Sequence, residues 1–396
     1  MQKEFDLVIY GATGFTGRLA AQYMMTAGKC DTLRIAIAGR DTNKLLAVQQ
    51  ACEIKPTILI ADSSQPDTIE TMVQKTRVVL SFAGPYSLYG EPVIAACAKW
   101  GVDYLDITGE TPFIHTMIQR YQEQAVATGA RLIPFSGFDS IPADLTVYLA
   151  LQAARNHSLQ IDNICLYYQI KGGFNGGTLA SALYISEYVD KKILYNSNNL
   201  IPDTSWPRAS SSSLKIIYEP VLSRWTTPFF MASINKAVVR RSAWLRSQDG
   251  ESRDIFQYDE RLIMSKRSGY LKACLTMLFL AGFQFLSGNS IGRKLLKRLG
   301  PKPGEGPSAE VRKQGFFRGQ LICRHQDICN LIVTMERNGD PGNEITIALA
   351  CESSLLVVDN AFQTQRKGFI TPSIAFGDKL ITQLKNAGFR FSTEFK

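Results

Sequence analysis

The sequence has little that could hold a metal ion or form a disulfide framework. It contains eight cysteines but no C-x-x-C pair, and its only three histidines, His115, His157 and His325, lie far apart. Zinc sites and disulfide-stapled domains normally show regular spacings of these residues. We therefore expect no metal site, and reduced, mostly buried cysteines that are typical of a cytoplasmic protein.

Two further absences limit localisation and partners. No charged segment followed by an apolar run precedes the first expected strand at Phe5, so we expect no secretory leader. No RNA- or DNA-binding motif is present, although a net charge of +9 and a pI near 9.1 suit anionic partners. We expect no nucleic-acid binding. A phosphorylated cofactor, an acidic carrier protein or a membrane surface would fit the charge.

The sequence also lacks an uninterrupted apolar run of the ~20 residues that span a bilayer. Its most apolar stretch, 272–286, is shorter and contains Thr276 and Gln284. Basic residues lie at both ends of this stretch, namely Lys266, Arg267, Lys272, Arg293, Lys294, Lys297 and Arg298. Such flanks suit a helix lying on anionic lipid, so we expect peripheral membrane contact through 272–286 or, alternatively, a core helix or the interface of a homodimer.

A glycine-rich turn near the N-terminus predicts a phosphate-binding loop. It follows the apolar run 5–9 and opens a helix expected from Phe15 to about Gly28. Glycines allow a left-handed turn and close approach of the backbone, and a helix N-terminus favours a pyrophosphate. The spacing G-x-x-G-x-x-G departs from the common G-x-G-x-x-G, and a plain tight turn is the alternative. The expected cofactor-binding residues are Gly11, Ala12, Thr13, Gly14, Phe15, Thr16 and Gly17.

The second apolar strand, 33–38, ends just before Arg40. In a dinucleotide-binding fold this position faces the adenosine ribose, where an acidic residue binds NAD and an arginine accommodates the 2′-phosphate of NADP. Arg40 can bind a phosphate through two hydrogen bonds, and Lys44, one helical turn further on, adds a charge. We therefore expect NADP. The alternative is a solvated helix start with Asp41 as its N-cap.

Strand signals then alternate with helical patterns through the first domain, expected over residues 1–143. Further strands are expected at 57–61, 78–82, 102–106 and 131–134, and helices at 66–75, 91–100 and 112–128. This alternation predicts an α/β, Rossmann-type domain with a doubly wound parallel sheet, whose ligands lie beyond the carboxyl ends of the strands.

Residues just after two of these strands are further candidates for cofactor binding. Asp62 and Ser63 are expected near the adenine, although they could simply cap the next helix. Ala83, Gly84 and Pro85 are expected near the nicotinamide, although Gly84-Pro85 forms a turn under either interpretation.

Several motifs in one order resemble the saccharopine dehydrogenase-like oxidoreductases, and among them the trans-acting enoyl reductases of bacterial polyketide lipid synthesis. The motifs are Gly11–Arg18, Ala38–Arg40, Ala83–Gly90, Tyr104–Glu110, Ser136–Asp144, Gly172–Thr178, Lys302–Ser308, Gly339–Gly342 and Gly368–Pro372. The resemblance implies an NADPH-dependent enzyme that reduces an enoyl or carbonyl group of a lipid or polyketide-type acyl substrate. Two positions depart from the family pattern, because Asn175 replaces a serine and Asn343 replaces an aromatic residue. Both departures concern the substrate more than the cofactor.

Beyond the first domain we expect an α+β substrate or dimerisation domain over 144–350, with an antiparallel or mixed sheet. Its expected strands are 161–170, 315–323, 330–337 and 344–350. The glycines at 172–177 precede an expected helix at 179–193, so they form either a second site for a carbonyl or oxyanion or a flexible bend. C-terminal helices within 351–396, expected from the segments 347–360 and 373–388, return to the first domain, as the resemblance implies.

The expected reaction needs a proton donor near the nicotinamide, for which Tyr86, Tyr89 and Asp139 are candidates by position. We predict Tyr86, because a phenol just past the fourth strand could reach a carbonyl over the ring. The alternative is that Tyr86 packs over the cofactor or its own turn. Two other functions stay open: an imine or ketone reductase acting on an amino-acid-like substrate, and a non-catalytic NADP-binding protein on a lipid surface.

Overall fold

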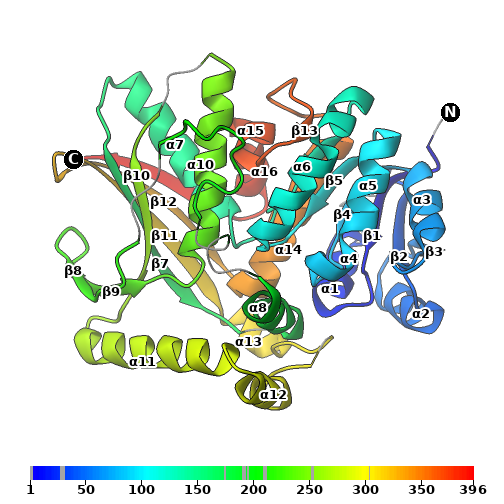
Figure 1. Cartoon of the computed structure of the whole chain (residues 1–396), viewed down its shortest axis with the longest axis horizontal. Coiled ribbons are helices and arrows are strands. Elements are labelled where there is room, and N and C mark those ends of the chain that lie inside the picture. Colours follow the sequence, from blue (N-terminus) through cyan, green and yellow to red (C-terminus); the bar gives the residue numbers. More distant parts are fainter. Residues whose placement is uncertain are drawn as a thin grey trace.

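The computed structural model describes residues 3–26, 32–173, 175–189, 193, 196–207, 212–250, 254–302 and 304–396. Two seven-stranded sheets with their helices lie side by side (Figure 1). Gly28, Cys30, Phe174 and Pro303, which belong to segments discussed above, lie outside the described residues, as does the segment 190–192 of the expected helix 179–193.

The first sheet is parallel throughout, with the strand order β13-β6-β5-β4-β1-β2-β3. Its strands are β1 (Phe5–Tyr10), β2 (Ile35–Gly39), β3 (Thr57–Ile60), β4 (Thr76–Ser81), β5 (Asp103–Asp106), β6 (Arg131–Ile133) and β13 (Gly368–Phe369). The order of the first six strands is that of a Rossmann fold, which confirms the predicted fold class.

Helices cover both faces of this sheet because side chains along each strand alternate between them. In β1, Leu7 and Ile9 join one buried cluster, and Val8 and Tyr10 join the other. The first cluster includes residues of α1 (Phe15–Met24), α2 (Thr42–Ala51) and α14 (Thr346–Val358). The second includes residues of α3 (Pro66–Gln74), α5 (Glu91–Trp100) and α6 (Thr111–Thr128). The short α4 (Tyr86–Tyr89) precedes α5.

The second sheet is mixed, with the order β14-β12-β11-β7-β10-β9-β8. Its strands are β7 (Asn163–Lys171), β8 (Ile217–Glu219), β9 (Arg224–Pro228), β10 (Gln257–Ile263), β11 (Phe316–His325), β12 (Ile328–Asn338) and β14 (Arg390–Phe395). Only β7 and β10 pair in parallel; the other pairs are antiparallel. Two helices, α7 (Ile141–Asn156) and α10 (Ala232–Gln248), pack against this sheet. The predicted mixed α+β architecture is therefore confirmed.

The strand predicted at 344–350 is wrong. These residues form a π-helical turn, Pro341–Ile345, that leads into α14. The β-branched run Ile345, Thr346 and Ile347 resembles a strand, but α14 is buried on nearly all sides and so shows no one-sided pattern. α14 does pack on α1 and β4, as expected of the segment 347–360.

The C-terminal segment contributes more than helices. After α14 it adds β13 to the first sheet, then α15 (Pro372–Phe376) and α16 (Asp378–Asn386). Its last strand, β14, pairs with β12 in the second sheet. The segment 351–396 thus ties both sheets together.

Four helices complete the described fold: α8 (Gly176–Tyr188), α11 (Gly269–Ser287), α12 (Ser290–Leu299) and α13 (Ala309–Lys313). In Figure 1, α11 and α12 lie along the lower edge of the molecule, and α8 lies above them in contact with both.

Candidate cofactor and active site

The glycine loop is packed so closely against the backbone that two of its glycines leave no room for a side chain. Gly11 has φ +77°, and a Cβ at this position would lie 2.7 Å from the backbone N of Ala83. A Cβ at Gly17 would lie 2.3 Å from the carbonyl oxygen of Gly11. Gly14 is the N-cap of α1, so the first-turn N–H groups of this helix have no intrahelical acceptor. The loop therefore has the close packing and the first-turn N–H groups of a phosphate-binding loop, and its contact with the diphosphate of NADP stays a prediction.

The expected adenosine end brings together residues from three strand ends. The phenol of Tyr10 lies beside Ser63, Asp62 and Arg40, and burial raises its pKa. Arg40 is exposed, and its guanidinium forms no hydrogen bond with any residue that the structure describes. It is therefore available to bind a 2′-phosphate. Tyr10 was missed from the sequence, although its position as the last residue of β1 marks it.

One alternative considered from the sequence for this end is found in the structure, and the other is not. Asp41 is the N-cap of α2, because its Oδ1 accepts a hydrogen bond of 3.0 Å from the backbone N of Lys44. Asp62 does not cap α3, whose N-cap is Gln65; it forms its own turn by accepting a hydrogen bond of 2.9 Å from the backbone N of Ser64. Neither of these two hydrogen bonds uses the side chain of Lys44 or Ser63. The contacts of these side chains with the cofactor stay predictions.

Glu110 fixes the turn at the expected nicotinamide end. It is buried, and its carboxylate accepts hydrogen bonds from the backbone N of Tyr86 at 2.9 Å and of Ser87 at 2.8 Å. It also accepts one of 3.0 Å from the hydroxyl of Ser181 on α8. Glu110 therefore holds the Ala83-Gly84-Pro85 turn and joins it to the second domain. In the sequence, Glu110 stands out only as the end of the motif Tyr104–Glu110, which gives no sign of this anchoring role.

The side chain of Tyr86 points into the interior. It is 5% exposed, and its hydroxyl donates a hydrogen bond of 2.9 Å to the carbonyl oxygen of Ser81 at the end of β4. Burial raises its pKa well above the usual range. This geometry favours the alternative that Tyr86 packs against its own turn over the predicted role of proton donor.

Asp139 differs from Tyr86 in that its side chain forms no hydrogen bond with any described residue. It follows β6 and precedes α7, and its Oδ2 lies 3.7 Å from where a Cβ on Gly109 would stand. It is half-buried, and burial raises its pKa to about 6. A carboxyl group in this state can give up a proton near neutral pH. Tyr89, the third candidate, is half-buried on α4.

The second domain covers the glycine loop through the segment 304–308. A Cβ at Gly306 would lie 2.5 Å from the ring of Phe15. Arg18 and Arg312 each place a guanidinium carbon 5.7 Å from the centre of that ring. These two cations lie close to the expected pyrophosphate, and sequence reasoning missed both of them.

The two positions that depart from the family pattern contact each other. Asn175 is the N-cap of α8, accepting a hydrogen bond of 3.0 Å from the backbone N of Thr178. Its Nδ2 donates a hydrogen bond of 2.8 Å to Oδ1 of Asn343, which in turn donates to Asp340. The two asparagines therefore form one unit that sets the direction of the α8 N-terminus.

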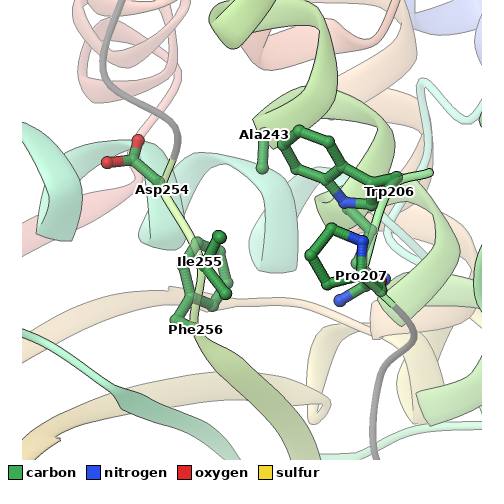
Figure 2. Close-up of a pocket in the computed structure, with 7 residues that line it drawn as sticks. Trp206, Pro207, Ala243, Asp254, Ile255 and Phe256 are labelled. Atoms are coloured by element: carbon green, nitrogen blue, oxygen red, sulfur yellow. The ribbon is translucent and has the colours of Figure 1, made fainter. Parts of the chain in front are cut away.

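A small pocket is formed by other residues (Figure 2). It is lined by Trp206, Pro207, Arg240, Ala243, Asp254, Ile255 and Phe256. Its volume of about 10 Å³ has room for roughly one water molecule. It is too small for a substrate. Among the described residues, no group of three His, Cys, Asp or Glu side chains could hold a metal ion.

A buried polar network surrounds Glu260 in the second domain. Its carboxyl group accepts hydrogen bonds from Tyr258 at 2.6 Å, Tyr168 at 3.3 Å and Asn235 at 3.0 Å. Asn235 in turn accepts one of 3.1 Å from Ser140, the residue after Asp139. Burial raises the pKa of Glu260 to about 8. The network supports the loop that carries Asp139.

The titration of Glu260 predicts a pH-dependent stability. A carboxyl group whose pKa is raised by folding contributes most stability below its unfolded pKa of 4.5, and this contribution is lost as pH rises through about 8. Relative to Glu260→Gln, the wild-type free energy of unfolding is expected to fall between about pH 5 and pH 8, by at most about 1.4 kcal/mol per pH unit. Urea unfolding at several pH values measures this difference. A difference that stays constant with pH would contradict the assignment.

Comparison with known proteins agrees with this geometry. Residues 7–133 match the family model described as the saccharopine dehydrogenase NADP-binding domain. A provisional trans-acting enoyl reductase of Mycobacterium tuberculosis is 37% identical over 99% of this chain and 98% of its own length. The trans-acting enoyl reductase of Mycobacterium leprae is 32% identical with the same coverage.

Among solved structures, the saccharopine dehydrogenase (L-Glu forming) of Saccharomyces cerevisiae has the same fold. Its TM-score is 0.62 at 11% identity, covering 99% of this chain and 100% of that one. The fold, the matched model of an NADP-binding domain and the full-length relatives lead to one conclusion. The chain is an NADP-binding oxidoreductase that belongs to the saccharopine dehydrogenase-like family, together with the trans-acting enoyl reductases.

Proposed function

We propose that this oxidoreductase uses NADPH to reduce the enoyl C=C bond, or a carbonyl group, of a lipid or polyketide-type acyl substrate. The relatives that share nearly its whole length are named trans-acting enoyl reductases. The observation that supports it most is a continuous edge of the first sheet on which the glycine loop, Arg40 and the Ala83–Pro85 turn meet. We expect the enzyme to act in the cytoplasm.

In this proposal the chain's own residues bind the cofactor and orient its nicotinamide. The glycine loop and the N-terminus of α1 hold the pyrophosphate, and Arg40 holds the 2′-phosphate. Glu110 fixes the turn that faces the nicotinamide and links it to α8. NADPH supplies the hydride for the β-carbon of the substrate. A protein group must then supply the proton.

We assign the proton-donor role to Asp139 in preference to Tyr86. The Asp139→Asn variant is expected to lower kcat by on the order of 10²- to 10⁴-fold, because its amide cannot donate a proton as an acid does. Above pH 6 or so, the wild-type kcat/KM should decline by about tenfold per pH unit, since the pKa of Asp139 is about 6, and this slope should vanish in the variant. Tyr86→Phe is the matched control and should keep most of the turnover. Loss of turnover in Tyr86→Phe alone, with NADPH still bound, would restore the tyrosine.

The substrate class is tested by NADPH oxidation, followed as loss of absorbance of the reduced nicotinamide. A trans-2-enoyl thioester is expected to be turned over, whereas a 2-oxo acid with an amino acid is not. Turnover of the second pair alone would support the imine or ketone reductase. A protein that binds NADPH but oxidises it with neither would be the non-catalytic alternative.

The apolar segment 272–286 also belongs to this proposal, because an acyl substrate must reach the site from a lipid, a carrier or solution. A membrane surface and a second copy of this chain are the two partners that suit this segment. By length and composition, the helix that contains it, α11, could also cross a membrane.

A further inference from the structure

The helices α11 and α12 expose an apolar surface that the described part of the fold leaves uncovered. Only 11% of the most apolar 18-residue stretch of α11 is buried within the fold. Its exposed side chains recur at helical spacing and are 57–76% exposed, namely Leu271, Leu275, Leu278, Phe279 and Phe285. In α12, Ile291, Leu295 and Leu299 continue the surface at intervals of four residues. A patch of this extent marks an interaction site.

The charge of this segment selects the kind of partner. Residues 264–299 contain seven basic side chains and no acidic one, so they supply seven of the nine net positive charges of the chain. In α12 the exposed Lys294, Lys297 and Arg298 flank the apolar row. Apolar rows bordered by exposed cations are typical of helices that lie on anionic lipid. A second copy of the chain would bring like charges together, which opposes pairing.

The helix α11 is held along the surface of the protein by contacts at both of its ends. At its start, Gly269 lies against Trp225 of β9, and Ala273 is fully buried. At its end, Arg293 of α12 donates a hydrogen bond of 3.1 Å to the carbonyl oxygen of Ser287. Because Arg293 also forms an ion pair with Glu187 of α8, both ends of α11 are attached to the same side of the fold. A helix held in this way lies in a membrane plane rather than across it.

The same surface is connected to the candidate active site. Arg293 forms an ion pair of 3.1 Å with Glu187 of α8, and Gly300, just after α12, lies against Leu179. The chain then continues to Glu305, whose carbonyl oxygen accepts a hydrogen bond of 3.0 Å from the backbone N of Gly176. Gly306 follows, against Phe15 of the glycine loop. The surface therefore borders the side of the site that α8 and the segment 304–308 form.

We propose that α11 and α12 dock the protein in the plane of an anionic lipid bilayer, next to the α8 side of the active site, so that acyl substrates reach it from the lipid. The delivery of acyl substrates from the lipid rests on the proposed function, whereas the docking itself does not. In this arrangement the exposed leucines and phenylalanines enter the acyl boundary, and the lysines and arginines contact lipid phosphates. Lipid contact and catalysis then share the helix α8.

Vesicle co-sedimentation of the full chain tests the docking. The protein is expected to bind vesicles of phosphatidylcholine with phosphatidylglycerol and to bind pure phosphatidylcholine at least about tenfold more weakly, and high salt should release it. The Leu278→Glu/Phe279→Glu and Lys294→Glu/Lys297→Glu variants should each lose at least about tenfold in binding. Ile328→Glu, at a site as exposed as Leu278, and Lys385→Glu are matched controls that should bind as wild type does.

The same experiment shows whether a partner other than lipid covers this surface. Absence of binding to anionic vesicles overturns the proposal, and a dimer that the Leu278→Glu/Phe279→Glu variant dissociates would assign the surface to a second copy. Binding that is unchanged by high salt would overturn the role given to the lysines and arginines. All variants should bind NADPH and reduce a soluble short-chain enoyl thioester as wild type does. If soluble turnover is present but vesicle binding is not, the docking fails while the proposed function stands.

Discussion

Replacing Gly17 with alanine is expected to raise the Kd for NADPH by more than about 100-fold. The new Cβ would stand 2.3 Å from the carbonyl oxygen of Gly11 and 3.0 Å from the Cα of Ala12, so the loop must open. Opening removes at least two charge-assisted hydrogen bonds from backbone N–H groups to phosphate, each worth about 1.5–3 kcal/mol. Quenching of protein fluorescence by NADPH measures the affinity.

The comparison variant for this experiment is Gly282→Ala. A Cβ at Gly282 would meet nothing within 4 Å, so its NADPH affinity should equal that of wild type. Circular dichroism establishes that both variants are folded. A folded Gly17→Ala protein that binds NADPH normally would show that the glycine loop is only a tight turn.

Charge reversal of Arg40 is expected to change the cofactor preference. In Arg40→Glu, the Kd for NADPH should rise by on the order of 100-fold, because a guanidinium–phosphate pair is replaced by a repulsive one. The Kd for NADH should stay the same or fall, since a glutamate can accept a hydrogen bond from the ribose 2′-hydroxyl. Titration with both cofactors measures the two effects in one protein.

A matched charge reversal far along the chain controls for the net charge. Lys385→Glu changes an exposed lysine of α16 and should leave both affinities unaltered. Equal weakening of NADPH and NADH in Arg40→Glu would mean that Arg40 supports the fold rather than the 2′-phosphate. In that case Lys44, whose Nζ lies 3.8 Å from Asp41, would be the next residue to change.

The first domain could be predicted because its signals are local. Most of its strands are short apolar runs, and most of its helices start at a side-chain cap or near a proline, as at Asp41 and Pro66. The glycine loop and Arg40 follow from their position after such strands. These features need no knowledge of distant contacts.

Other features depend on contacts that a sequence does not display. The direction of the Tyr86 side chain is set by the carbonyl of Ser81 and by Glu110. The hydrogen bond between Asn175 and Asn343 joins residues 168 positions apart. α14 was mistaken in part for a strand because burial on all sides removes the pattern on which such predictions depend. Local propensity is overridden in each case by tertiary structure.

The position of α14 has a consequence for biosynthesis. β4 and β5 emerge from the ribosome about 240 residues before the helix that covers them, which at ~5–20 residues per second is a delay on the order of tens of seconds. During this interval one apolar face of the nascent first sheet has no helix from the C-terminal segment to cover it. Until translation is nearly complete, the helices available to cover that face are those of the N-terminal part, such as α1 and α2, whose residues share one buried cluster with α14.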